Sequence, residues 1–172
     1  YMAYRNLAAA YYSHLGRPEK ALPLLEKALA LHPGDGQLVW EKGYLMTRLH
    51  AAPLDAAAFL AASGVMREDV TLERCRALNL AGQHAQVLEL MASRQFVPCE
   101  GGEHAVAEQY MFAHHALGRR AIQAGDLQTA LTHFLAAQQL PENLGAGLWN
   151  EVLLVPHQYF EAICRQRLGD ED

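Results

Sequence analysis

The chain has 172 residues, of which 51% are hydrophobic, and 14 Lys and Arg against 19 Asp and Glu give a net charge of −5. This composition supports a folded domain with a continuous core. Scattered basic residues on a net negative chain argue against a nucleic-acid partner. Ala and Leu dominate while β-branched residues are sparse, so we expect an all-α fold.

The three cysteines are far apart and form no C-x-x-C pair. We expect Cys75 and Cys164 in the core, Cys99 as an exposed thiol, and a cytoplasmic protein without disulfides, structural metal or cofactor. No uncharged apolar run approaches the ~20 residues that cross a bilayer, so no membrane partner is expected. Because Tyr1 is not an initiator residue, we expect a fragment of a longer chain.

The predicted elements are helices separated by glycine turns. In chain order, the apolar periodicity predicts helices at 2–15, 18–31, 37–49, 54–62, 68–81, 83–93, 103–124, 126–139 and 156–168. They form hairpins at about 2–33, 36–63, 68–93 and 103–140, followed by the last helix. Four turns carry a glycine, which adopts the left-handed backbone without steric penalty: Gly16, Gly82, Gly125 and Gly169. We also expect Asp126 to cap the helix that it begins.

Small and large side chains recur at equivalent positions of the second helices. The two clearest sets, at i, i+4 and i+7, are Ala21, Leu25, Ala28 and Ala130, Phe134, Ala137. Weaker copies begin at Ala56, 35 residues after Ala21, and at Val87, 31 residues further on. Such a period is typical of arrays of helix-turn-helix repeats.

The segment YRNLAAAYYSHLGRPEKALPLLEKALALHP resembles a tetratricopeptide repeat. The residues that match its packing positions are Leu7, Tyr11, Gly16, Ala21, Leu25, Ala28 and Pro33. The resemblance is close over 4–33 and weaker over 105–141. It implies a tetratricopeptide-like solenoid of about four antiparallel hairpins plus a final helix, in one domain from 1 to 172.

The glycine spacing lengthens in the second half of the chain. Gly82 and Gly125 are 43 residues apart, and Gly125 and Gly169 are 44 apart, about ten more than one period of ~34. The surplus residues are SRQFVPCEGGEH and LPENLGAGLWNEVLLVP, which both follow the second helix of a hairpin. Equivalent insertions emerge on the same side of a repeat array, so we expect the two loops to touch.

These loops hold the densest set of polar and aromatic side chains, and long loops often carry function. The binding residues that we predict are Glu100, Glu103, His104, Glu142, Asn143, Trp149 and His157. His104 and Glu108 lie one helical turn apart, but no third ligand stands at a recognisable spacing, so we expect no metal site. Thin helical layers seldom enclose a dry pocket, so we predict no catalytic residue and no enzyme.

Three further features have structural interpretations. Of the adjacent His114 and His115, we expect one to face the partner helix and the other to face water. Trp40 and Tyr44 match core positions of a repeat, with an aromatic ligand platform as the alternative. The first helix, 2–15, is apolar over most of its circumference, so we expect it to dock on an upstream repeat or domain, or on a second copy of the chain.

Two strings, SRQFVPCEGGEHAVAEQY and ALGRRAIQAGDLQTALTHFLAAQQLPENLGAG, carry a second resemblance. They are similar to the C-terminal helical-repeat region of large bacterial proteins whose N-terminal part is an uncharacterised β-sandwich related to aldose-epimerase-like folds. The resemblance covers about 38–168 and implies a module of a carbohydrate-related protein. Cys99 stands where the resemblance implies a tryptophan.

Three hypotheses about function follow. The first is a non-catalytic scaffold that presents a surface to a protein partner or to another domain of its parent chain. The second is an accessory module that binds an oligosaccharide through loops 96–104 and 140–157, with Trp149 stacking on a sugar ring. The third is a fragment of an enzyme.

Overall fold

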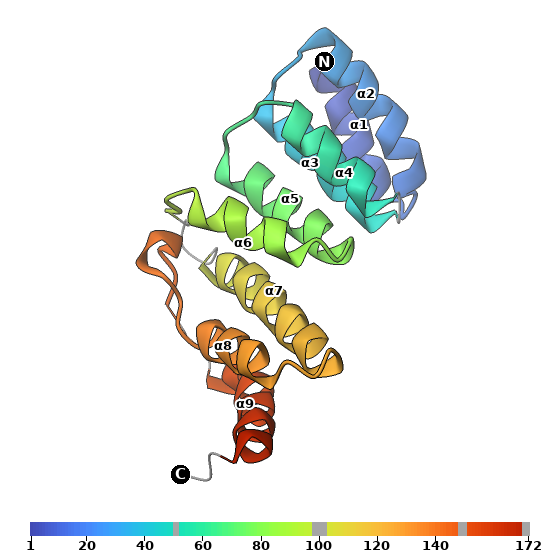
Figure 1. Cartoon of the computed structure of the whole chain (residues 1–172). Helices are drawn as coiled ribbons and strands as arrows, with labels where there is room; N and C mark the ends of the chain where they lie inside the picture. Colours follow the sequence, from blue (N-terminus) through green and yellow to red (C-terminus); the bar gives the residue numbers. More distant parts are fainter. Residues whose placement is uncertain (50–51, 98–102, 148–150, 170–172) are drawn as a thin grey trace. The chain divides into compact units, whose positions relative to one another are not determined.

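A computed structural model describes residues 1–49, 52–97, 103–147 and 151–169 (Figure 1). The α-helices are α1 (Met2–Ser13), α2 (Ala21–Leu31), α3 (Gly36–Arg48), α4 (Pro53–Ala62), α5 (Glu68–Leu80), α6 (His84–Ala92), α7 (Glu103–Gln123), α8 (Leu127–Ala137) and α9 (Val155–Leu168). The short 3₁₀ turns are η1 (Pro18–Lys20), η2 (Glu142–Leu144) and η3 (Glu151–Leu154). No strand occurs in these ranges, which confirms the predicted all-α, tetratricopeptide-like repeat fold.

The chain divides into two compact units, Tyr1–Ala81 with α1 to α5 and Gly82–Asp172 with α6 to α9. The predicted hairpin at 68–93 has one helix in each unit. The organisation of the chain as one domain therefore stays a prediction. No helix among the described residues combines the length and apolar character that crossing a membrane requires.

In the first unit, α1 packs against α2, α3 packs against α4, and α5 lies against both α3 and α4. The small–large–small face predicted for α2 is fully buried at Ala21, Leu25 and Ala28. It meets Leu38 and Leu45 of α3 in one apolar cluster. The sequence periodicity therefore placed this face correctly in the core.

The burial pattern of α3 recurs in α5 at a spacing of 32 residues. The buried pairs are Leu38 and Val70, Val39 and Thr71, Glu41 and Glu73, Gly43 and Cys75, Leu45 and Ala77, and Thr47 and Asn79. The two helices thus have equivalent places in consecutive repeats. One of the recurring positions holds a carboxylate that is almost fully buried, 2% exposed in Glu41 and 1% exposed in Glu73.

In the second unit, α7 pairs with α8, and α6 and α9 pack on α7 and α8 respectively. The core between α8 and α9 contains Ala130, Leu131, Phe134 and Cys164. Cys75 and Cys164 are both fully buried, which confirms their predicted core positions. Cys99 lies outside the described residues.

Helix α7 approaches α8 closely at Gly118. A Cβ atom here would lie 2.7 Å from Cζ of Phe134, whose ring is fully buried. Overpacking costs about 1–3 kcal/mol, while replacing a helical glycine gains about 1 kcal/mol. We therefore expect Gly118→Ala to lower the free energy of unfolding by about 1 kcal/mol in urea denaturation. A gain in stability, as in an uncrowded helix, would contradict the close approach.

The turns follow their local signals. Gly16, Gly82, Gly125 and Gly169 all have a positive φ, as predicted. Oδ1 of Asp126 accepts a hydrogen bond from the Thr129 amide at 3.0 Å, so the predicted cap is confirmed.

One helix start was predicted wrongly. The helix expected from Pro18 begins only at Ala21, because Pro18–Lys20 forms a 3₁₀ turn in which the Lys20 amide donates to the Arg17 carbonyl. Proline fits the first turn of either helix type, so it does not distinguish them.

Candidate functional site

The two inserted loops touch, as predicted. The Phe96 amide donates to the Asn143 carbonyl at 2.7 Å. Nδ2 of Asn143 donates to the main-chain carbonyls of Met91, at 2.9 Å, and Arg94, at 2.7 Å. The two N–H donors of this side chain therefore join η2 to the end of α6 and the residues after it.

The other predicted binding residues have varied positions. His104 in the first turn of α7 and Glu142 in η2 are exposed, whereas His157 in α9 is only 5% exposed. Glu103 begins α7, and its side chain lies outside the described part of the chain, as do Glu100 and Trp149. The two buried members of the set, Asn143 and His157, belong to separate contacts. The binding role of the whole set stays a prediction.

We expect Asn143→Ala to destabilise the second unit by about 2 kcal/mol. The substitution removes both donors and leaves the Met91 and Arg94 carbonyls without this partner, and each such loss costs about 1 kcal/mol or more. Urea denaturation of the wild type and variant measures the difference. Glu142→Ala, at the exposed neighbouring position, is the control and should change stability by less than about 0.5 kcal/mol. Equal effects of the two substitutions would show that the loop contact contributes little.

The adjacent histidines of α7 are both half-buried, so the prediction that one faces water was wrong. Nδ1 of His114 lies 3.0 Å from Nδ1 of His133 in α8, and Nδ1 of His115 lies 3.3 Å from Nδ1 of His157 in α9. Burial lowers the pKa of His114 to about 4, with a smaller contribution from His133. Burial likewise lowers the pKa of His157 to about 4.

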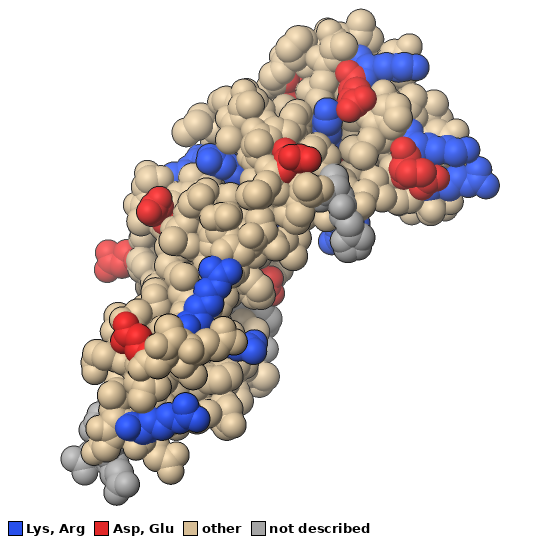
Figure 2. Space-filling model, turned by 45° about the vertical axis from the view of Figure 1, so that its right-hand side comes forward, with Lys and Arg blue, Asp and Glu red and all other residues tan. Residues whose placement is uncertain are grey.

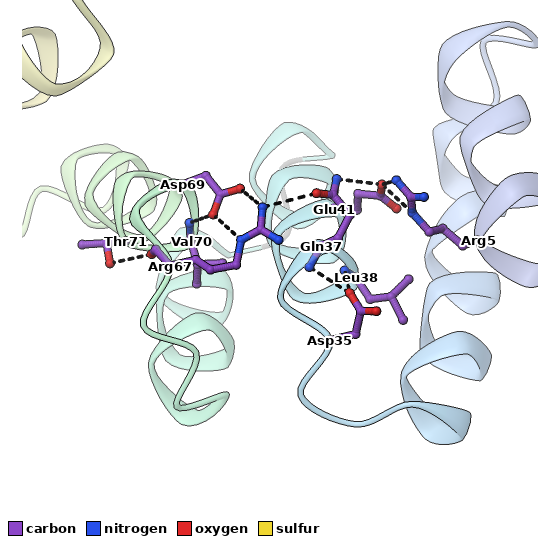
Figure 3. Close-up of polar contacts among 9 residues, drawn as sticks. All are labelled: Arg5, Asp35, Gln37, Leu38, Glu41, Arg67, Asp69, Val70 and Thr71. Carbon is purple, nitrogen blue, oxygen red and sulfur yellow. Dashed lines mark hydrogen bonds and ion pairs between the residues drawn. The ribbon is translucent and has the colours of Figure 1, made fainter. Parts of the chain in front are cut away.

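In the first unit, a continuous chain of polar contacts crosses three helices (Figure 3). We call it the polar ladder; its members are Arg5 of α1, Gln37 and Glu41 of α3, and Arg67 and Asp69 at the start of α5. Each of these helices is the first after a turn that enters a new repeat. The ladder therefore joins consecutive repeats.

Glu41 is the centre of the polar ladder. Its Oε1 accepts hydrogen bonds from Nε and Nη2 of Arg5, at 2.9 and 2.6 Å, and from Nε2 of Gln37, at 3.0 Å. Among the described residues, its buried Oε2 has no hydrogen-bond partner. The hydrogen bonds to Glu41 raise the pKa of Arg5, so the guanidinium stays charged. A carboxylate this deeply buried depends on that neighbouring cation.

The other end of the polar ladder is open to solvent. Oε1 of Gln37 accepts a hydrogen bond from Nη2 of Arg67 at 3.4 Å, so the amide bridges the two ion pairs. Arg67 binds both carboxylate oxygens of Asp69, and the exposed fractions of the two side chains are 47% and 37%. The start of α3 is held by Asp35, whose Oδ1 accepts from the amides of Gln37 and Leu38.

An aromatic stripe continues along α3 from Gln37. The rings of Trp40 and Tyr44 stack with centroids 5.3 Å apart, and the Arg48 guanidinium lies 4.5 Å from the Tyr44 ring centroid. Both rings are half-buried, although they were expected at core positions. The stripe therefore offers stacking and hydrogen-bonding groups on an accessible helix face.

The ladder and the stripe are neighbours. Burial first, and then the Glu41 carboxylate, raise the pKa of Tyr12 in α1, with a further contribution from Tyr44 and an opposing one from Arg5. The Tyr12 hydroxyl is thus within electrostatic reach of both features. We define the docking face as Arg5, Tyr12, Gln37, Trp40, Tyr44 and Arg48.

Sequence reasoning did not find this face because it favoured the irregular loops. One signal was present: Glu41 and Glu73 stand at equivalent positions 32 residues apart, each among apolar helix residues. A charge that recurs with the repeat period is a candidate for an inter-repeat contact. Elsewhere on the surface, charged side chains stand singly or in small groups (Figure 2).

Within the described ranges, no three His, Cys, Asp or Glu side chains are grouped closely enough to hold a metal ion. Residues 2–45, which include α1, α2 and most of α3, match the family model of the tetratricopeptide repeat. No solved structure matches the chain. The segment that carries most of the docking face is thus similar to a tetratricopeptide repeat, within a chain that has a helical-repeat fold throughout its described part.

Proposed function

We propose that the chain is a non-catalytic helical-repeat scaffold that binds a protein partner, or another domain of its parent chain, through the docking face. The observation that carries the proposal is the accessible stripe of Trp40, Tyr44 and Arg48 beside the polar ladder. The match of residues 2–45 to the tetratricopeptide repeat supports it, because such repeats generally mediate contacts between proteins.

The residue types on the docking face suit a protein partner. Trp, Tyr and Arg are enriched among the residues that contribute most to protein interfaces, because they combine large contact areas with directed hydrogen bonds. Trp40 and Tyr44 are already held by their mutual stacking, so little side-chain freedom is lost on binding. The Gln37 amide and the Arg48 guanidinium add polar groups at either end of the stripe. An extended peptide segment across α3 is the partner that these groups fit.

The experiment uses peptides selected from a random library on the wild-type chain, with affinities measured by fluorescence polarisation. We expect Tyr44→Ala and Arg48→Glu each to weaken binding at least tenfold, as for residues at the centre of an interface. Arg17→Glu is the charge-matched control, because Arg17 lies exposed in the turn after α1, and it should change affinity less than twofold. Circular dichroism checks that the variants fold. Selected peptides that are insensitive to both docking-face variants would refute the proposal.

The oligosaccharide hypothesis depends on Glu100 and Trp149, which lie outside the described residues, so it stays a prediction. The same variants separate it from the scaffold hypothesis. Binding to an oligosaccharide array that is unchanged in Tyr44→Ala and Arg48→Glu would favour the sugar-binding module. The expected docking of the first helix on another repeat, domain or copy also stays a prediction. Tyr1, Tyr4 and Leu7 are 39%, 39% and 47% exposed.

A further inference from the structure

The second unit contains an apolar pocket of about 260 Å³ between α7 and the segment where η3 leads into α9. Its apolar walls are Met111, Phe112, Leu153 and Pro156. His115 and His157 also line it, together with Glu108. Phe112 is 53% exposed and Met111 is 4% exposed, so the pocket runs from the surface to the core of the unit. It lies outside the docking face.

The two histidines give the pocket a defined polar character. Their Nδ1 atoms are 3.3 Å apart, so one ring donates its Nδ1–H and the other accepts it. Burial lowers the pKa of both rings, and that of His157 to about 4, so the pair is uncharged at pH 7. The ring that donates from Nδ1 then has a lone pair on Nε2, and its partner has an Nε2–H. The pair thus retains one donor and one acceptor for a ligand.

Size and charge restrict the ligand. The volume lies below the ~300–1,000 Å³ of pockets that hold drug-sized molecules, so one aromatic ring with a small substituent fits and a nucleotide does not. Among the described lining residues, Glu108 alone is charged at pH 7, which disfavours an anion. The nearly buried imidazole of His157 favours a ligand that forms hydrogen bonds over a purely apolar one, because an unsatisfied buried polar group is costly.

We propose that this pocket binds a neutral aromatic group with a hydroxyl, the chemistry of a phenol. The ring lies between Met111, Phe112, Leu153 and Pro156, where aromatic and apolar contacts hold it. The hydroxyl can both donate and accept a hydrogen bond, which matches the two functions of the paired imidazoles. The phenol belongs either to a tyrosine side chain of a partner or to a free small molecule.

The first test titrates the chain with p-cresol and, in parallel, with toluene, which has the same ring and methyl group without the hydroxyl. The readout is the NMR shift of the His115 and His157 ring protons. We expect saturable binding of p-cresol and at least tenfold weaker binding of toluene. Equal affinities for the two probes, or no saturable shift with p-cresol, would overturn the proposal.

Variants then locate the site. Leu153→Trp fills the pocket and should abolish p-cresol binding, whereas Leu168→Trp adds the same side chain at an exposed position of α9 and should leave it unchanged. His157→Phe should reduce the affinity for p-cresol to that for toluene. Binding that survives in Leu153→Trp would overturn the assignment to this pocket, even if His157→Phe fails to fold.

A third probe distinguishes the sources of the phenol. N-acetyltyrosinamide carries the same ring on a peptide backbone. Affinity within twofold of that for p-cresol supports a tyrosine side chain of a partner, because the mouth of the pocket then admits the backbone. Binding of p-cresol with exclusion of N-acetyltyrosinamide supports a free phenolic molecule.

Discussion

Replacing Arg5 by methionine is expected to destabilise the first unit by about 3 kcal/mol. The substitution leaves the carboxylate of Glu41, only 2% exposed, with Gln37 as its remaining described hydrogen-bond donor. Breaking a buried ion pair from one side costs about 3–5 kcal/mol, and the partial exposure of Arg5 places the effect near the lower limit. The free energy of unfolding in urea measures the loss.

A double substitution tests the cause. Arg5→Met combined with Glu41→Leu removes both charges, and we expect it to recover most of the lost stability, because an apolar pair suits a buried site. Arg67→Met is the matched control: its partner Asp69 is 37% exposed, so the loss should stay below about 1 kcal/mol. Equal, small effects of Arg5→Met and Arg67→Met would show that the buried charge is not a determinant of stability.

Acidification from pH 7 to pH 4 is expected to destabilise the second unit through His157. Burial lowers the pKa of His157 in the folded chain from 6.5 to about 4, so below pH 6.5 the unfolded chain binds a proton that the folded chain does not. Its contribution is therefore present above pH 6.5 and is lost as the pH falls towards 4. At about 1.4 kcal/mol per pKa unit, the loss is about 3 kcal/mol.

The groups around His157 share this dependence. His115 faces it and Arg119 lies near His115, and both disfavour additional positive charge in the cluster. Stability measured by urea denaturation at several pH values should fall less steeply with acid in His157→Phe than in the wild type. His104→Phe, at an exposed position of α7, should retain the wild-type slope. The same slope in the wild type and His157→Phe would contradict the prediction.

The helices and their turns could be predicted because their signals are local. A glycine such as Gly125 allows the left-handed backbone that ends a helix, and Asp126 caps the next helix with its own side chain. The contact between the two inserted loops was also predictable, because the lengthened glycine spacing placed both at equivalent points of a repeat. The sequence did not show that Asn143 uses both its side-chain donors on main-chain carbonyls.

The polar contacts between helices were not predictable in the same way. His114 and His115 are about 100° apart around α7, which suggested one buried and one exposed ring. Since α8 carries a partner for one ring and α9 a partner for the other, both are half-buried. Glu41 was missed for a related reason: a carboxylate is ordinarily expected at the surface, and its cation is 36 residues away in the sequence.

The shared burial pattern of α3 and α5 has a consequence for the length of the protein. A second copy of residues 36–67, inserted directly after the first, would meet on its N-terminal side the surface that α5 now meets. On its C-terminal side, it would offer α5 the surface that α3 and α4 offer today. Segmental duplication of the gene could thus extend such a chain by a whole hairpin without a newly evolved contact, and the carboxylate at the Glu41 position would mark the alignment of each added unit.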